Sequence, residues 1–440
     1  MFWIELLVVL GMLLLGVRYG GIFLGMSSGA AIAILIFVFG CAPGSPPIDV
    51  MMIIMTVVVT ASVLQASGGM DYLIQVAIKL LRKNPKNISY IAPLVSWLFT
   101  FMCGTGNIVF SILPVIAEVS REAGVRPERP ISISVIASQQ AITACPISAA
   151  TVALLGFLAP FDVSLIDILI VCIPSTLIGV ICGSLYAAHI GKELNIDEEY
   201  LARVAAGESA PINEKTEFKE KAFGKREKNA VALYILATLI VVAFGLFPSL
   251  RPTFEVGGKM TALSMTMMIE IVMMIMAGII IMVSKVEAKA VIEQSVFKQG
   301  LMGVYSIFGL AWAGDTLVKN NIGYLKDGAQ GLVTAYPWVF ALVLFFISAL
   351  ILSQAATVSA LMPLGLALGL PAPSLIGMFP AVNGYFFVPS YATVLAGIAF
   401  DRTGTTKIGK FVFNHSYMIP GCITSVVSVA VGLSLAAFVF

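Results

Sequence analysis

The stretch SQAATVSALMP at residues 353–363 decides how this chain is interpreted, because it follows the almost unbroken apolar run 339–352. Hydroxyl and amide side chains are costly inside a hydrophobic segment unless a partner satisfies their hydrogen bonds. A second stretch, GTGNIVFSILP at 104–114, also places a polar cluster at the same spacing before a proline. We interpret the two stretches as two copies of one structural device.

The composition is that of a membrane protein. Of 440 residues, 59% are hydrophobic and 11% are charged, whereas a soluble chain carries about a quarter charged residues. Apolar stretches of roughly bilayer-spanning length recur from end to end, which predicts an all-α polytopic membrane protein embedded in a lipid bilayer. The opening MFWIELLVVL lacks a basic region and a cleavage site, so we expect a first span there and not a signal peptide.

Several function classes are disfavoured. The six cysteines show no CxxC spacing and the two histidines stand alone, so we expect no metal, no cofactor and no disulfide framework. No nucleic-acid-binding motif is present, and no nucleophile–base pair, HExxH or phosphate loop indicates an enzyme.

Hydropathy predicts ten spans and two hairpins that enter the membrane and return. The expected spans lie near 3–17, 20–40, 49–66, 131–158, 164–189, 229–249, 261–284, 299–317, 372–400 and 411–437, and the expected re-entrant hairpins are 89–118 and 337–370. With the N-terminus outside, 22 of the 26 lysines and arginines fall on the inner side, which favours two outside (periplasmic) termini. Twelve full crossings would give the same orientation.

The polar segment 191–228 divides the chain into two halves, 1–190 and 229–440, and we expect it to be a cytoplasmic linker loop. Each half holds five spans and one hairpin. Because five is odd, the second half enters the membrane from the opposite side, which predicts an inverted repeat of the kind common in secondary transporters. The stretches SQQAITACPISAATV (138–152) and AVNGYFFVPSYATV (381–394) align on their prolines and support the repeat.

Proline interrupts a helix, so the spans 131–158 and 372–400 are expected to be broken. If both breaks and both hairpin tips converge near the midplane, helix N-termini offer N–H donors and partial positive charge to an anion without a buried arginine. We therefore predict a site for a small polar anion that works by alternating access. Its predicted residues are Thr105, Gly106, Asn107, Thr143, Pro146, Ser148, Ser353, Gln354, Thr357, Asn383, Ser390 and Thr393.

Other readings stay open. Each of these hydroxyls could simply bond its own backbone or a neighbouring helix. Glu270 is an intramembrane carboxylate, and it could carry protons or be a scaffold residue. Asp401 and Arg402 in FDRTGTT could form a gate, or a salt bridge beside a helix that Thr405 and Thr406 cap. The segment 69–86 fits an interfacial amphipathic helix, matched more weakly by 319–333.

Four stretches resemble one known family. GTGNIVFSILPVIAEV, SQQAITACPISAATV, ILSQAATVSALMP and FDRTGTTKIGKFVFNHS are similar to the anaerobic four-carbon-dicarboxylate uptake (Dcu) transporters, A/B type, over essentially the whole chain. The resemblance implies exchange of fumarate, malate or aspartate for succinate across the bacterial inner membrane. It also implies kinship with the ion-transporter superfamily, whose members are typically homodimers with an elevator-like moving domain.

Three alternatives accompany this reading. A sodium- or proton-coupled dicarboxylate uptake carrier could use the same scaffold, and a membrane enzyme or a sensor would belong to a different class. The preferred substrate, the coupling ion and a regulatory partner of the 191–228 loop cannot be decided from the sequence.

Overall fold

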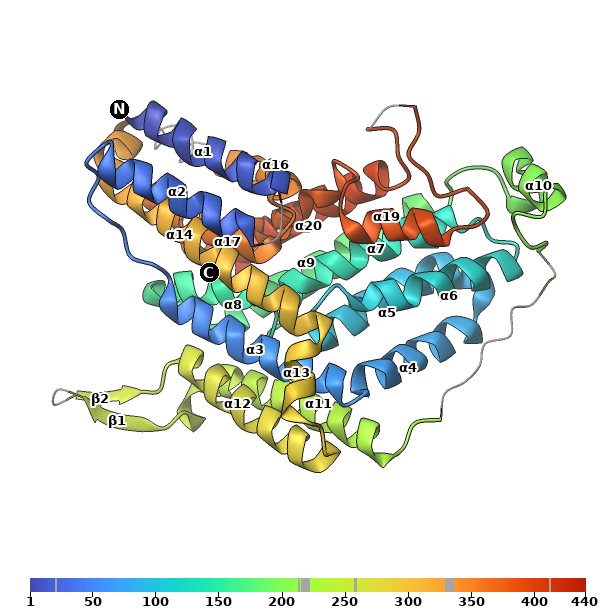
Figure 1. Ribbon diagram of the computed structural model, residues 1–440, viewed down its shortest axis with the longest axis horizontal. Coiled ribbons are helices and arrows are strands. Elements are labelled where there is room, and N and C mark those ends of the chain that lie inside the picture. The colour runs from blue at the N-terminus through green and yellow to red at the C-terminus, as the bar shows by residue number, and fades with distance from the viewer. Residues whose placement is uncertain (20–21, 213, 215–221, 257–258, 329–335, 411–412) are drawn as a thin grey trace.

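The computed structural model describes residues 1–440 except 20–21, 213, 215–221, 257–258, 329–335 and 411–412 (Figure 1). Its described residues form helices and one short β-hairpin. Seven described helical segments are long and apolar enough to cross a membrane: Ile48–Ala66, Glu128–Phe161, Leu165–Ala187, Lys225–Leu246, Met265–Ser284, Ser295–Asn321 and Met418–Val439. This agrees with the prediction of a helical, multi-pass chain.

Six helices make up what we call the outer set. They are α1 (Phe2–Tyr19), α2 (Phe23–Phe37), α3 (Ile48–Ala66), α11 (Lys225–Leu246), α12 (Met265–Ser284) and α14 (Ser295–Gly328). Helix α1 packs on α2, α2 on α14, α3 against both α12 and α14, and α11 on α12. The α2–α14 contact is glycine-dependent, since a Cβ on Gly25 would lie 2.4 Å from the carbonyl oxygen of Tyr305.

Two helical hairpins belong to what we call the inner set. The first joins α5 (Ile88–Cys103) to α6 (Ile108–Glu122), and the second joins α16 (Val339–Ile351) to α17 (Gln354–Ala367). Both turns use a left-handed residue to end the first helix, Gly104 with φ +68° and Leu352 with φ +56°. These short turns lie within the predicted hairpins 89–118 and 337–370.

Two interrupted helices complete the centre of the inner set. In the first, α7 (Glu128–Ala144) stops before Pro146 and α8 (Ala149–Leu158) follows. In the second, α18 (Ala372–Met378) continues into the 3₁₀ segment η5 (Phe379–Phe386), and α19 (Ala392–Phe400) starts after Pro389. In both, the proline lies in a non-helical link, where its missing N–H removes no helical hydrogen bond.

Helices α9 (Leu165–Ala187) and α20 (Met418–Val439) also belong to the inner set, and they pack closely along each other. Serine and glycine make this contact possible, since a Cβ on Gly179 would lie 2.0 Å from Ser428 Oγ. Helix α9 also packs on α5 and α7, and α20 packs on α18 and η5.

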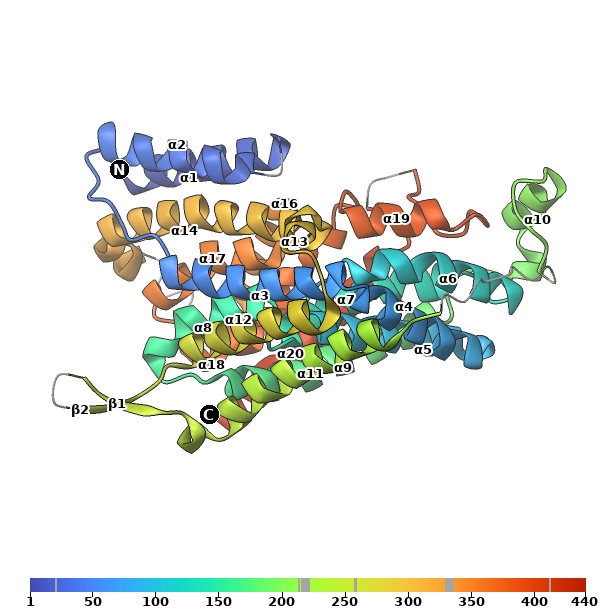
Figure 2. The ribbon, with the colours of Figure 1, turned by 60° about the horizontal axis from the view of Figure 1, so that its bottom comes forward.

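The remaining elements lie between or outside these helices. They are α4 (Gly69–Lys83), α10 (Glu198–Ala205), α13 (Ala288–Glu293), the 3₁₀ turns η1 (Pro85–Asn87), η2 (Ala159–Phe161), η3 (Leu194–Ile196) and η4 (Pro248–Leu250), and the antiparallel strands β1 (Thr253–Val256) and β2 (Lys259–Ala262). The β-hairpin and α10 lie at opposite ends of the molecule (Figures 1 and 2).

Three details differ from the sequence predictions. Between the predicted spans 229–249 and 261–284 no element is predicted, whereas the structure forms an antiparallel β-hairpin there, in register from Thr253–Ala262 to Val256–Lys259. The last helix begins at Met418 and not near 411, because residues 413–417 form turns and a bridge, while 411–412 lie outside the described residues. Helix α14 reaches Gly328 with a kink at Asn321, and 329–333 of the expected amphipathic segment also lies outside the described residues.

Candidate functional site

A cavity of about 410 Å³ lies between the inner set and the outer helices α2, α3 and α14. Residues at the starts of four helices line it: Asn107 before α6, Ala149 in α8, Ser353 before α17 and Tyr391 before α19. Helix N-termini carry partial positive charge and unpaired N–H groups. No Asp, Glu, Lys, Arg or His occurs among the described lining residues, so the charges nearest the cavity lining are the partial charges of backbone and neutral polar groups.

The first hairpin tip, Thr105–Gly106–Asn107, faces both this cavity and α14. The Asn107 amide nitrogen donates its side-chain hydrogen bond to Gln299 Oε1 of α14, which links the inner set to the outer set. Gly106 packs against Gln139 of α7 so closely that a Cβ would lie 2.9 Å from Gln139 Nε2. Thr105 Oγ1 accepts from the Asn107 N–H at 3.3 Å and so shapes the tip.

The second hairpin tip is built differently. Ser353 caps α17, its hydroxyl accepting from the Ala356 N–H at 3.3 Å. Thr357 is buried and donates to the Ser353 carbonyl oxygen at 2.8 Å, so its hydroxyl serves its own helix. Of the predicted site residues at the two tips, Asn107, Ser353 and Gln354 are among the described residues that line the cavity, and Thr357 is not.

Gln354 connects the second tip to a buried polar network. Its Nε2 lies 2.8 Å from Tyr385 Oη, 3.1 Å from Gln139 Oε1 and 3.2 Å from Asn383 Oδ1. Gln139 in turn donates to Thr393 Oγ1 at 3.3 Å. The network thus joins α7, α17, η5 and α19 through side chains from both halves of the chain.

Asn383 extends this network toward the first break. Its Nδ2 lies 3.2 Å from Gln140 Oε1 and 3.5 Å from Thr143 Oγ1, both on α7. Thr143 donates to the Gln140 carbonyl oxygen at 2.8 Å. Burying a polar group without a hydrogen-bond partner is costly, and these bonds offset that cost for the Asn383 amide nitrogen and the Gln140 amide oxygen.

At the first break, around Pro146, backbone groups are hydrogen-bonded by side chains of the same chain segment. Ser148 caps α8 by accepting from the Thr151 N–H at 3.1 Å and donates to the Ile142 carbonyl oxygen at 2.6 Å. Thr151 Oγ1 also lies 3.1 Å from that carbonyl oxygen. The freed carbonyl at the end of α7 is therefore bound by hydroxyls from its own chain segment.

At the second break, around Pro389, side chains of the same segment make fewer hydrogen bonds to the backbone. Ser390 is exposed and makes only a 3.4 Å bond to the Val388 carbonyl oxygen. Tyr391 occupies the N-cap of α19, where no side chain caps the helix. Thr393 is buried and reaches Gln139 of the other half, not its own break.

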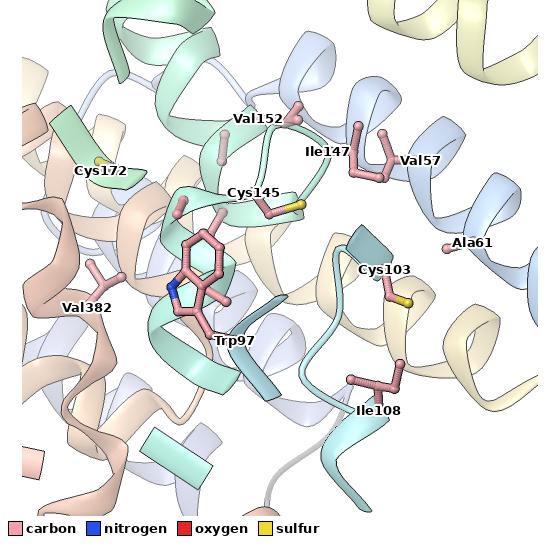
Figure 3. Close-up of a cluster of buried hydrophobic side chains, with 14 of the residues drawn as sticks. Val57, Ala61, Trp97, Cys103, Ile108, Cys145, Ile147, Val152, Cys172 and Val382 are labelled. Atoms are coloured by element: carbon pink, nitrogen blue, oxygen red, sulfur yellow. The ribbon is translucent and has the colours of Figure 1, made fainter. Parts of the chain in front are cut away.

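Apolar residues surround the first tip and the first break. Figure 3 shows Cys103 at the end of α5 and Cys145 in the α7–α8 link, with Ile147 beside them and Val57 of α3 nearby. All six cysteines carry free thiols. Among the described residues, no group of three or more His, Cys, Asp or Glu side chains could hold a metal ion.

The three predicted gate or coupling residues lie away from the cavity lining. Glu270 is half-buried on α12 of the outer set. Asp401 is buried at the end of α19, and its carboxylate accepts from the Thr405 hydroxyl at 2.8 Å and the Thr406 N–H at 2.7 Å. Arg402 is exposed and lines a separate polar pocket of about 510 Å³.

The expected cap formed by Thr405 and Thr406 is absent from the following helix. Helix α20 starts at Met418, and its N-cap, Tyr417, makes no side-chain cap bond. Thr405 instead accepts from the N–H of Glu128, the first residue of α7, at 3.1 Å. The threonines fold a loop around Asp401, so that carboxylate is bound by Thr403, Thr405 and Thr406 and not by Arg402.

Sequence reasoning missed several polar residues that the structure brings to this region: Gln139, Gln140, Gln299, Tyr385 and Tyr391. The adjacent glutamines within an otherwise apolar span were a usable signal, because carboxamides at membrane depth need partners. Gln299 and the tyrosines carried no comparable signal.

The sequence as a whole matches one family. Residues 1–440 match the family described as "Anaerobic c4-dicarboxylate membrane transporter". The C4-dicarboxylate transporter DcuA of Wolinella succinogenes is 40% identical over 435 residues, 98% of each chain. DcuA of Escherichia coli K12 is 40% identical, and the anaerobic C4-dicarboxylate transporter DcuB of E. coli O157:H7 is 38% identical, each alignment covering 99% of both chains.

The chain belongs to the DcuA/DcuB family. The resemblance inferred from its motifs is thereby confirmed, and the chain is a multi-pass membrane transporter and not an enzyme.

Solved structures agree at the level of the fold. The YdaH transporter of Alcanivorax borkumensis matches with a TM-score of 0.59 and 14% identity, covering 88% of this DcuA/DcuB-family chain and 84% of YdaH. MtrF of Neisseria gonorrhoeae matches with a TM-score of 0.54 and 11% identity, covering 91% and 84%. Both are transporters, and at these identities the similarity concerns the helical architecture alone.

Proposed function

We propose that this protein exchanges C4-dicarboxylates across the bacterial inner membrane, taking up fumarate, malate or aspartate and releasing succinate. The observation that carries the proposal is the cavity lined by residues from the starts of four helices and by no charged side chain. N–H groups at helix N-termini bind carboxylates directly. The cavity volume of about 410 Å³ falls in the usual range for small-molecule sites, roughly 300–1,000 Å³.

Within this proposal, the predicted residues have different roles. Thr105, Gly106, Asn107, Ser353 and Gln354 line the cavity and would face the substrate, joined by Gln299 and Tyr391. Asn383 and Thr393 support Gln354 and Gln139 from behind. The hydroxyls of Thr143, Ser148 and Thr357 are committed to backbone carbonyl oxygens, which supports a structural role for them, as for the break formed by Pro146.

We further propose that the halves 1–190 and 229–440 are inverted repeats. The packing supports this, because contacts in one half recur in the other. Helix α1 packs on α2 as α11 packs on α12, and α8 packs on α17 as α19 packs on α6. Each half contributes three helices to the outer set and one hairpin, one broken helix and one long helix to the inner set.

This division suggests an elevator-type mechanism in which the inner set moves against the outer set. The cavity lies at their boundary, so such a movement would expose it alternately to the two sides. The Asn107–Gln299 hydrogen bond crosses this boundary and would break when the inner set moves. A homodimer, whose outer sets would form the fixed part, remains a prediction from the family resemblance.

We propose that both termini face the periplasm and that 191–228 is cytoplasmic. The distribution of 22 of 26 basic residues supports this orientation. In addition, the N- and C-termini lie in the half of the molecule that carries the β-hairpin, while α10 lies at the opposite end (Figure 2). A reporter fused after Phe440 should be active only when it requires the periplasm, and cytoplasmic activity would refute the orientation.

Counterflow in proteoliposomes tests the proposed exchange. Vesicles loaded with labelled succinate should release it when fumarate is added outside, with no requirement for a sodium or proton gradient. Release that depends on such a gradient would instead support the coupled carrier. Fumarate-independent release, or none, would contradict dicarboxylate exchange.

A further inference from the structure

A cluster of buried charges holds the linker to the inner set, at the end of α7 far from the cavity. Its centre is Arg126, in the turn between α6 and α7. Arg126 Nε donates to Glu128 Oε2 at 2.6 Å, and its Nη1 pairs with Asp197 of the linker. The side chains of Arg126, Glu128 and Asp197 are only 8%, 10% and 12% exposed. We call these three residues the clasp.

The clasp is reinforced on the linker side. Asp197 caps α10, accepting from the Tyr200 N–H at 3.0 Å. Burial by itself would raise the pKa of the Asp197 carboxyl, but the Tyr200 N–H and the Arg126 guanidinium outweigh burial and hold that pKa below its usual value. Arg129 adds a bond to the Ile190 carbonyl oxygen at 2.9 Å. The first part of the linker is therefore held against the inner set, and its Asp197 carboxyl is ionised at neutral pH.

The clasp is also joined to the loop that follows α19. Glu128 Oε1 accepts from Ser416 Oγ at 2.6 Å, and the Glu128 N–H donates to Thr405 Oγ1 at 3.1 Å. Lys407 of this loop pairs with Glu199 of α10. Glu128 thus holds three chain segments together: the start of α7, the linker through Arg126, and the loop after α19.

Helices α7 and α19 are consequently attached to each other at both ends. At the cavity end, Gln139 of α7 donates to Thr393 of α19 at 3.3 Å. At the other end, Thr405 and Ser416 bind Glu128. Glu128 and Gln139 lie eleven positions apart on α7, so a change of angle at one end displaces side chains at the other end. A rigid helix transmits such a rotation along its whole length.

We propose that Arg126 is a positioning residue for substrate binding, which sets the angle between α7 and α19 through Glu128 and thereby aligns Gln139 with Thr393. This inference rests on the proposed dicarboxylate site and adds a specific role for the linker. Removing Arg126 takes away the guanidinium that pairs with both buried carboxylates, Glu128 and Asp197, and a buried charge that loses its partner is strongly unfavourable. The loop after α19 then loses its fixed anchor, although no residue that lines the cavity has changed.

The test compares succinate affinity in four purified variants. Arg126→Met and Asp197→Asn should weaken binding about threefold to thirtyfold, the usual range for residues that act on a site through packing. Arg126→Lys keeps a cation and should recover part of the affinity. Lys192→Met is the matched control, because Lys192 pairs with Glu198 on the same linker but with side chains 62% and 89% exposed, and it should bind succinate normally.

A second measurement separates positioning from general destabilisation. In substrate-free protein, hydrogen exchange in Arg126→Met should accelerate in α19 and residues 401–406 while α8 stays protected, because α8 is capped within its own segment. The maximal counterflow rate should change less than the affinity. If Arg126→Met fails to fold, Asp197→Asn decides the question, since it leaves no buried carboxylate unpaired and still frees Arg126 from the linker, so that Arg126 no longer holds Glu128 in a fixed position.

Folded Arg126→Met or Asp197→Asn protein with normal succinate affinity and unchanged exchange in α19 would overturn the proposal. Equal weakening by Lys192→Met would also overturn it, because any linker charge would then have the same effect. A wild-type protein that binds no succinate would contradict the proposed function, whereas the hydrogen-exchange result would still report on the clasp.

Discussion

The two breaks in the inner set use the same kinds of side chain for different purposes. At the first break, Ser148 and Thr151 bind carbonyl oxygens of their own segment. At the second break, Ser390 is exposed, α19 has no side-chain cap, and Thr393 reaches Gln139 in the other half. The backbone of the first break is therefore hydrogen-bonded by its own segment. The second break leaves helix N–H donors and the Ser390 hydroxyl for other partners. The proposed inverted repeat thus keeps one backbone plan while its two copies take different roles.

The two hairpin tips differ in the burial of the hydrogen bonds that their amide side chains make, and this difference gives the largest expected effect. Gln354→Leu removes one amide that faces three buried oxygens, so we expect unfolding to become easier by about 2–4 kcal/mol and transport to be lost. Asn107→Leu should cost less than about 1 kcal/mol, because its bond to Gln299 is exposed. Thermal unfolding in detergent, with counterflow, measures both. Equal destabilisation by the two variants would remove the contrast.

The threonines after the two breaks give the next effect. Thr393→Val should weaken succinate binding about tenfold to a hundredfold, since Gln139 loses an acceptor in the network that holds the cavity-lining Gln354. Thr151→Val should leave affinity unchanged and cost about 1 kcal/mol of stability, because its hydroxyl serves only its own segment. Binding in nanodiscs decides between them. Normal affinity in Thr393→Val would exclude Thr393 from the site.

The residues that end α5 and α16 sharpen the comparison further. Gly104 and Leu352 both adopt left-handed backbone angles, which suit glycine and strain leucine. Gly104→Ala should therefore destabilise by about 1–2 kcal/mol, and its Cβ would also lie 3.2 Å from the Ile147 carbonyl oxygen. Leu352→Gly should change stability by less than about 1 kcal/mol, since relief of strain offsets lost backbone restriction. Melting temperatures of the pair test this, and a large loss in Leu352→Gly would show that its side chain matters more than its backbone.

The serines beside the prolines give the smallest difference. Ser148→Ala removes an N-cap and should cost about 1 kcal/mol while transport continues. Ser390→Ala should change stability by less than about 0.5 kcal/mol, because Ser390 is exposed and weakly bonded. Denaturation curves of both proteins provide the comparison. A greater loss of stability in Ser390→Ala than in Ser148→Ala would contradict the conclusion that the first break, and not the second, is stabilised by hydroxyls of its own segment.

The sequence predicted the hairpins and breaks because proline, glycine and polar clusters are rare inside apolar spans and have few structural explanations. It placed Asn107, Gln354 and Asn383 in the central region, but it could not separate a hydroxyl that faces a cavity from one that bonds its own helix, as Thr357 does. That distinction depends on side-chain direction. The partners of Asp401 and Glu128 were also inaccessible, because they join segments far apart in the chain.

The absence of charged side chains among the described cavity-lining residues has an electrical consequence. A dicarboxylate with both groups ionised would cross with nearly its full charge of two, because partial charges on helix ends do not cancel it. Moving one elementary charge through a potential of 100 mV changes its free energy by about 2.3 kcal/mol. A dianion that crosses alone would therefore gain or lose about 5 kcal/mol, depending on its direction. Exchanging one dianion for another cancels this work. At the proposed site, the exchange of one dianion for another is therefore insensitive to membrane voltage, whereas one-way movement would depend on it strongly.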